Sequence, residues 1–254
     1  MHHGQFSFRL RMKHALILLP CLCTLFVGCV EYQQVLTLNP DGSGTLEVTY
    51  KVDPDTAQAL LQSGMPGNDR GAAMPKRLFD EVQVREDFAS YETDGVDLEF
   101  VNITEAGRDE TMRLGFRFED LHGILSTPFF AQSTVSLRRD VRGDLVLTQT
   151  LSGAGPEWGP TIDLSTEATD AALREQLQGV VVEFRFVVPG TIRTTNADRV
   201  DGRTAVWAFD PSIDRDALTR AQQAQFRVVF DGSGSTIPAV GPQQIRLSLT
   251  GPGK

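Results

Sequence analysis

Cysteine and histidine are scarce in this chain of 254 residues, and the few that occur exclude several kinds of site. The three cysteines are Cys21, Cys23 and Cys29, so residues 30–254 contain no disulfide and depend on core burial for stability. His122 is the only histidine beyond residue 14. A zinc site needs three or four His, Cys or carboxylate ligands, and a Ser–His or Cys–His mechanism needs a histidine beside its nucleophile. We therefore expect no metal and no cofactor, and we read His122 as a link residue.

Motifs of catalytic and ion-binding loops are also absent. The chain has no Gly-x-Ser-x-Gly elbow. The turn-rich stretch 39–50 is similar to a calcium loop, but Tyr50 stands at the twelfth position, where a bidentate Glu is needed. The adjacent acids Glu86–Asp87 and Glu119–Asp120 point to opposite faces in an extended chain, so neither pair shares a proton. These absences predict that the protein is not an enzyme.

Long hydrophobic runs are limited to residues 15–27, which are thirteen uncharged positions. As a helix this run would be about 20 Å long, whereas a bilayer core is about 30 Å thick and needs roughly 20 apolar residues. Arg9, Arg11 and Lys13 precede the run, with no acid among them. This pattern is typical of a signal peptide. Met12 followed by Lys13 already supplies a start and a positive charge, so Met1 and Met12 both fit as the first residue.

The run ends in Phe26-Val27-Gly28-Cys29, which resembles the lipobox of bacterial lipoproteins. The resemblance implies cleavage between Gly28 and Cys29 and attachment of a diacylglyceryl group to the Cys29 sulfur. Phe26 departs from the Leu that is usual at its position. The membrane would then be a partner through this lipid, and residues 1–28 would be a signal peptide. Because Val30 rather than Asp follows the cysteine, we expect the periplasmic face of the outer membrane in a host with two membranes.

Acidic residues outnumber basic ones, 33 to 24. Residues 1–28 hold three of the basic residues and no acid, so the chain after cleavage has 21 basic and 33 acidic residues and a net charge of −12. A surface this acidic repels nucleic acid and anionic headgroups. We therefore expect no nucleic-acid partner.

Alternation of apolar and polar residues predicts an α+β fold for residues 29–254, with a mostly antiparallel sheet built of hairpins and two to four helices packed on one face. The clearest strand is 45–52, which alternates over eight positions. The other expected strands are 30–39, 96–104, 112–118, 134–140, 144–151, 180–188, 225–230 and 243–249, with a further hairpin over 189–209. Helices are expected over 54–62, 75–85, 166–178 and 213–224. The Gly- and Pro-rich stretch 152–160 is the most marked seam.

Two short patterns resemble the LppM-type lipoprotein domain, a family named for a mycobacterial member. The first is the turn Asp41-Gly42-Ser43-Gly44, and the second is a late hairpin marked by Pro189, Gly190, Asn196, Gly202 and Trp207. The resemblance implies an envelope-surface protein in contact with lipid or glycolipid, without established chemistry. Many relatives carry a C-terminal transmembrane helix that this sequence does not show. From the residues alone, the hairpin positions are expected to fix a turn and fill a core.

Three functions follow as hypotheses. The preferred one is a non-enzymatic, lipid-anchored envelope protein that binds a partner protein or an apolar or lipid ligand, with the apolar link 121–130 as a mobile lip over the cavity. The second is an envelope hydrolase or carbohydrate-active enzyme that uses carboxylates from separate strands. The third is an assembly factor of the envelope.

The lipobox predicts that Cys29 is the site of acylation. Cells grown with labelled palmitate should yield a labelled wild-type protein and an unlabelled Cys29→Ala variant, because the thioether carries the diacylglyceryl group. Both proteins are compared in the membrane fraction by gel and autoradiography. Equal labelling of the two would contradict the prediction.

Overall fold

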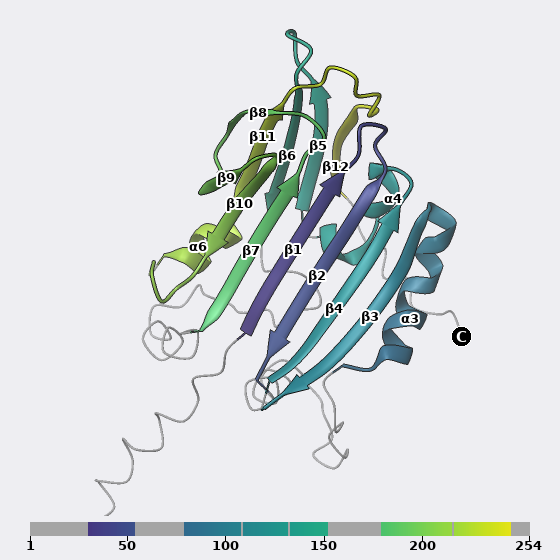
Figure 1. Ribbon diagram of the computed structural model, residues 1–254, viewed down its shortest axis with the longest axis vertical. Coiled ribbons are helices and arrows are strands. Elements are labelled where there is room, and N and C mark those ends of the chain that lie inside the picture. The colour runs from purple at the N-terminus through teal and green to yellow at the C-terminus, as the bar shows by residue number, and fades with distance from the viewer. Residues whose placement is uncertain are drawn as a thin grey trace, which may run out of the picture.

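The computed structural model describes residues 30–53, 79–151 and 179–244, except for 108, 132 and 215. Two β-sheets pack face to face in this part of the chain (Figure 1). The large sheet has seven strands in the order β3-β4-β2-β1-β7-β10-β9, with bounds β1 (Val30–Leu38), β2 (Gly44–Val52), β3 (Val96–Ala106), β4 (Asp109–Phe118), β7 (Val180–Val187), β9 (Arg199–Asp201) and β10 (Thr204–Phe209). The small sheet has five strands in the order β12-β5-β6-β11-β8, with bounds β5 (Ser133–Arg139), β6 (Leu145–Leu151), β8 (Ile192–Thr195), β11 (Gln225–Phe230) and β12 (Val240–Gln244).

Antiparallel hairpins build most of both sheets, as the alternation predicted. The pairs β1–β2, β3–β4 and β5–β6 are all consecutive in the chain, and each is joined by a short turn. One described pair runs parallel, because β1 lies beside β7 from Val30↔Val180 to Thr37↔Val187. This parallel pair lies in the middle of the large sheet. It joins the first hairpin to a strand that begins 150 residues later.

Each strand of the large sheet divides its side chains between a buried face and a polar face. On β2 the inward residues Leu46 and Val48 are fully buried. The outward residues of β2 and its neighbours form ion pairs across strands, such as Lys51–Glu31 at 2.8 Å and Arg113–Glu47 at 3.5 Å. These pairs are solvent-exposed and contribute little to stability. The burial of the inward face therefore decides how the sheet packs.

The small sheet covers the inward face of the large sheet over β7 and β10, where aromatic rings meet. The ring of Phe226 on β11 lies 4.7 Å from that of Phe184 and 5.0 Å from that of Trp207, measured between centroids. Phe226 is fully buried. Because β11 and β7 are both interior strands of their sheets, this contact joins the two layers away from their edges.

Helices cover the other half of the inward face, over β3 and β4. Phe88 on α3 (Glu81–Ala89) stacks on Phe129 of the 3-10 helix η3 (Pro128–Phe130) at 5.4 Å, and both rings pack on Phe116 of β4. The 3-10 helix η2 (Ser90–Asp94) follows α3 directly, and Gly95 in the left-handed conformation ends it.

The α+β class is confirmed, but the second sheet rather than a layer of helices supplies most of the cover. Among the described residues α3 is the longest helix, and the others, α4 (Leu121–Leu125) and α6 (Ala217–Gln222), have five and six residues. None of these helices is long and apolar enough to span a bilayer. Helix α3 begins at Glu81 because Asp80 caps it, accepting the Val82 N–H at 2.8 Å. The helices expected over 54–62 and 166–178 lie outside the described residues, as does the whole seam at 152–160.

The apolar link 121–130 is part of the core, so the expectation of a mobile lip is wrong. Leu121, Ile124, Leu125 and Phe130 are each 2 % exposed or less. Asp120 caps α4 by accepting the Gly123 N–H at 2.8 Å. The Thr127 hydroxyl donates to the Ile124 carbonyl at 2.7 Å. The run lacks alternation because it forms α4 and η3, which place their apolar side chains under β4.

The two Asp-Gly-Ser-Gly sequences form similar turns that lie side by side. Asp41 accepts the Ser43 N–H at 3.0 Å and Asp231 accepts the Ser233 N–H at 2.8 Å. The chain after the second turn then bonds to the first, since Thr236 N–H donates to the Pro40 carbonyl. The first turn closes β1–β2, and the second leads from β11 toward β12.

The hairpin expected over 189–209 is divided between the two sheets. Strand β7 ends in the large sheet, and after Pro189–Gly190 the chain enters the small sheet as β8 beside β11. It then returns to the large sheet for the β9–β10 hairpin. A Cβ added at Gly190 would overlap the Asp231 carbonyl oxygen, so only glycine permits this crossing.

Gly190→Ala should therefore lower the free energy of unfolding by about 2 kcal/mol or more, because backbone must move to admit the methyl group. The measurement is urea denaturation of the full chain, followed by circular dichroism. Gly241→Ala is the matched control, since no atom lies within 4 Å of its Cβ position, and it should change stability by less than about 0.5 kcal/mol. Equal effects at both positions would contradict the steric argument.

Candidate functional site

The late hairpin residues occupy two places in the fold. Pro189 and Gly190 lie at the crossing between the sheets, and Gly202 occupies the β9–β10 turn with a φ of 59°. Asn196 and Trp207 meet beside the small sheet, where Trp207 Nε1 donates to Asn196 Oδ1 at 3.3 Å. The sequence grouped these residues by spacing, and the structure brings only this last pair together.

Asn196 extends the β8–β11 ladder with its side chain. Its Oδ1 accepts the Arg227 N–H at 2.9 Å, and its Nδ2 donates to the Gln225 carbonyl. Its own N–H donates to the Arg227 carbonyl at 3.3 Å. The carboxamide therefore acts as a further peptide group at the point where β8 leaves the small sheet for the large one.

Trp207 lies under Asn196 with its indole in the ring cluster. It is 4 % exposed, and its ring lies 5.1 Å from that of Phe186 and 5.0 Å from that of Phe226. The bond to Asn196 satisfies the one polar atom of the buried indole. Trp207 thus contacts the large sheet, the small sheet and the β8–β9 connection at once.

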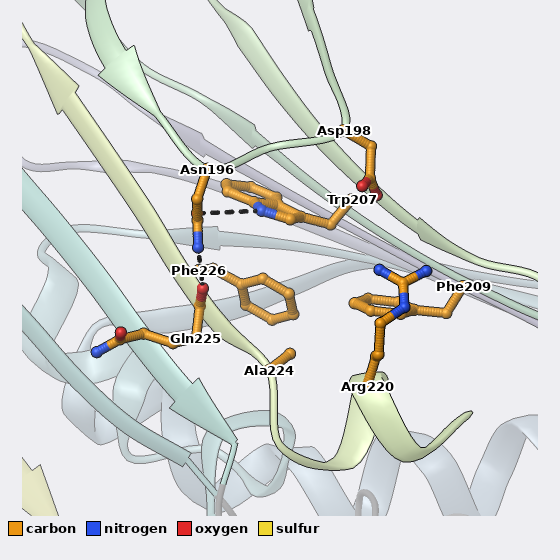
Figure 2. A pocket seen from close by; sticks show the side chains of 8 residues that line it. All are labelled: Asn196, Asp198, Trp207, Phe209, Arg220, Ala224, Gln225 and Phe226. Carbon is orange, nitrogen blue, oxygen red and sulfur yellow. Dashed lines mark hydrogen bonds between the residues drawn. The ribbon is translucent and has the colours of Figure 1, made fainter. Parts of the chain in front are cut away.

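A surface pocket of about 140 Å³ opens at this junction (Figure 2). The pocket is lined by three aromatic side chains, four polar or charged ones and one alanine. In that order they are Trp207, Phe209, Phe226, Asn196, Asp198, Arg220, Gln225 and Ala224. Since one water takes about 30 Å³ of liquid, the pocket has room for about four waters or for a small molecule.

The charged groups of the pocket are already engaged. Asp198 accepts the Ala208 N–H at 2.9 Å, which caps the part of β10 beyond its pairing with β9. The guanidinium of Arg220 lies 5.5 Å from the centre of the Phe209 ring, and its Nε donates to Asp214 at 2.8 Å. The backbone N–H of Asp216 and the Arg220 side chain hold the pKa of Asp214 below its ordinary value. Both charged side chains of the pocket are therefore held in place by interactions within the protein.

A second polar group lies inside the molecule, between the sheets. Gln34 on β1 and Gln149 on β6 are each 1 % exposed. The Tyr32 hydroxyl donates to Gln34 Oε1 at 2.8 Å, and its ring lies 5.0 Å from that of Tyr50. Burial raises the pKa of Tyr32 well above its ordinary value, and the nearby Tyr50 raises it further. Burial also raises the pKa of Tyr50, so both phenols are neutral.

Within the described part of the chain, several atoms of this interlayer group have no hydrogen-bond partner. They are Gln34 Nε2 and both Nε2 and Oε1 of Gln149. A buried polar group left without a partner costs about 1 to 3 kcal/mol. Alternation already placed Gln34 and Gln149 on inward faces, between Tyr32 and Leu36 and between Leu147 and Leu151. An amide between apolar neighbours on the inward face of a strand is the signal in the sequence that points to both positions.

The other candidates from the sequence lie apart from both places. His122 is on α4 with its side chain exposed. Asp120 caps that helix, while Glu119 follows β4 beside Gly95. No group of three His, Cys, Asp or Glu side chains is placed to hold a metal ion in residues 30–53, 79–151 and 179–244. Gly28 and Cys29 lie outside the described residues.

Comparisons with known proteins give a likeness of fold only. No family model and no curated protein matches the sequence. The folded domain of LppM from Mycobacterium tuberculosis, solved by NMR, is similar with a TM-score of 0.38 and 15% identity, over 81% of this chain and 92% of that one. Yeast LTA4 hydrolase in complex with bestatin is similar with a TM-score of 0.31 and 8% identity, over 72% of this chain but 26% of the hydrolase. At these scores neither structure carries a site or an activity over to this chain.

Asn196→Ala should lower the free energy of unfolding by about 1 to 2 kcal/mol, because it leaves the Trp207 indole N–H and two backbone groups of β11 without partners. Urea denaturation gives the value. Asn102→Ala is the control, since Asn102 lies exposed on the edge strand β3, and it should have an effect below about 0.5 kcal/mol. If the two variants lose the same stability, Asn196 does not act as the bridge described above.

Proposed function

We propose that the protein is a lipid-anchored lipoprotein of the bacterial envelope, that it is not an enzyme, and that its two-sheet domain binds an apolar ligand. One observation carries the anchor. Val30, the residue directly after the cysteine that the lipobox marks for acylation, is paired in strand β1 of the large sheet. An acyl group on Cys29 would therefore be carried by the direct neighbour of a residue in the large sheet.

The start of β1 is firmly seated in the large sheet. Val30 pairs with Val52 on one side and Val180 on the other, and its N–H donates to the Gly179 carbonyl at 3.2 Å. A lipid on Cys29 would thus be joined to the sheet without an intervening linker. A tether of this length holds the domain against the membrane surface rather than letting it swing away from it.

The short tether also selects which end of the domain faces the bilayer. Val52, Val180 and the β3–β4 turn lie at the end of the large sheet where β1 begins, and Lys51 on β2 reaches Asp109 on β4 at 3.4 Å there. The β5–β6 turn and the two Asp-Gly-Ser-Gly turns lie at the far end of the strands (Figure 1). The proposal therefore gives the domain a fixed orientation.

The character of the interior favours binding over catalysis. The inward faces of the sheets are aliphatic and aromatic, and the buried polar side chains of the described residues include a single ionisable carboxyl, Glu110. Glu110 accepts the Phe79 N–H at 3.3 Å. Such an interior suits an apolar molecule.

Fluorescence quenching tests the anchored orientation. An environment-sensitive dye on Ala106→Cys, in the β3–β4 region, should be quenched by spin-labelled lipids when the acylated protein is reconstituted in vesicles. The same dye on Val141→Cys, in the β5–β6 turn at the far end, should not be quenched. Both positions are exposed, and the acylated Cys29 leaves the introduced thiol as the only reactive one. Equal quenching at both positions, or none at either, would contradict a short tether at Val30.

A further inference from the structure

The interlayer amides lie on either side of one aromatic contact. Gln34 is the register partner of Phe184 in the large sheet, and Gln149 is the register partner of Phe226 in the small sheet. The rings of Phe184 and Phe226 touch across the interlayer at 4.7 Å. Each amide therefore neighbours one ring of the same pair, the two amides lie in opposite sheets, and Gln34 lies at the middle of β1.

The unpartnered atoms offer a defined set of hydrogen bonds. Gln149 presents two donors and an acceptor, and Gln34 presents donors through Nε2. The inventory matches a group that both donates and accepts, such as a hydroxyl or a carboxamide. An alkyl group alone would leave every one of these atoms unpaired.

The charge of the interior restricts the ligand further. The buried polar residues of the described chain are Gln34, Glu110, Thr127, Ser133 and Gln149, with no Lys, Arg or His among them. A carboxylate or phosphate placed here would have no countercharge, and an ammonium would have no partner beside the amides. Burying an unpaired charge is far more costly than burying a neutral polar group.

We propose that Gln34 and Gln149 form an internal binding site for the uncharged, hydrogen-bonding end of an otherwise apolar molecule. The inference rests on the proposed function and specifies the class of its ligand. The aromatic and aliphatic inward faces contact the apolar body, while the amides bind the hydroxyl or carboxamide end. Phe226, the register partner of Gln149, also lines the surface pocket of Figure 2.

The test uses four probes that share a six-carbon chain and differ in their polar end: 1-hexanol, hexanamide, hexanoate and hexylammonium. Each is titrated at pH 7 into the ¹⁵N-labelled full-length protein in detergent micelles. The side-chain amide signals of Gln34 and Gln149 are followed by NMR and assigned from Gln34→Met and Gln149→Met. Hexanol and hexanamide should shift both amide signals in a saturable way, whereas hexanoate and hexylammonium should not.

The variants provide the second arm. Each methionine keeps the side-chain length and removes the amide, so affinity for hexanamide should fall at least tenfold in the double variant. Its unfolding temperature should stay the same or rise, because unpaired buried amides are replaced by apolar groups. A variant that unfolds earlier would overturn the description of these amides as unpartnered.

Three results would overturn the inference. One is the absence of saturable shifts with any probe, as expected if the amides bind water only. Another is equal binding of the neutral and charged probes. The third is undiminished hexanamide binding in the double variant, which would leave apolar binding, and so the proposed function, intact while removing the amides from it. Loss of the anchor in the palmitate experiment would instead overturn the proposed function and leave these titrations interpretable.

Discussion

The insertion of one ring from the small sheet into the aromatic face of the large sheet is the contact on which this fold depends. Phe226 is fully buried and lies within 4.7 to 6.2 Å of the rings of Phe184, Phe186, Trp207 and Phe209. Such ring pairs contribute about 0.5 to 1.5 kcal/mol each beyond the area that they bury. With no disulfide available to residues 30–254, the relative position of the two layers is set by this packing and by the smaller cluster around Phe88.

The chain crosses between the two sheets near Phe226, because it supplies strands to both of them there. Strands β7 and β10 carry the receiving rings, β11 carries the inserted ring, and β8 lies beside β11. The chain must therefore leave the large sheet after β7 and return to it for β9. Gly190 permits the departure because a side chain there would meet the Asp231 carbonyl, and Asn196 secures the return by bonding to β11 and to Trp207 at once. Gly190 and Asn196, which the sequence placed in one hairpin, therefore lie at the two points where the chain crosses between the sheets.

Alternation in the sequence predicted the strands and hairpins well, because a strand buried on one face has apolar residues at every second position. It could not assign strands to sheets, because β7 and β8 show the same local pattern whichever layer they join. The parallel β1–β7 pair joins segments 150 residues apart and has no local signal at all. For the site, the inward positions of Gln34 and Gln149 could be read from their apolar neighbours. Their lack of partners could not, because it depends on which side chains of the opposite sheet come to face them.

Unpaired amides in an otherwise apolar interlayer work against stability, and that makes their position informative. Leucine or methionine at both positions would satisfy the alternation and avoid the cost of burying an amide. The surrounding polar groups are neutral as well, since burial keeps the Tyr32 and Tyr50 phenols protonated. An interior meant only to hold two sheets together has no use for such a set. In the proposed site these same atoms would bind the polar end of the ligand, and their hydrogen bonds would offset the cost of burying them.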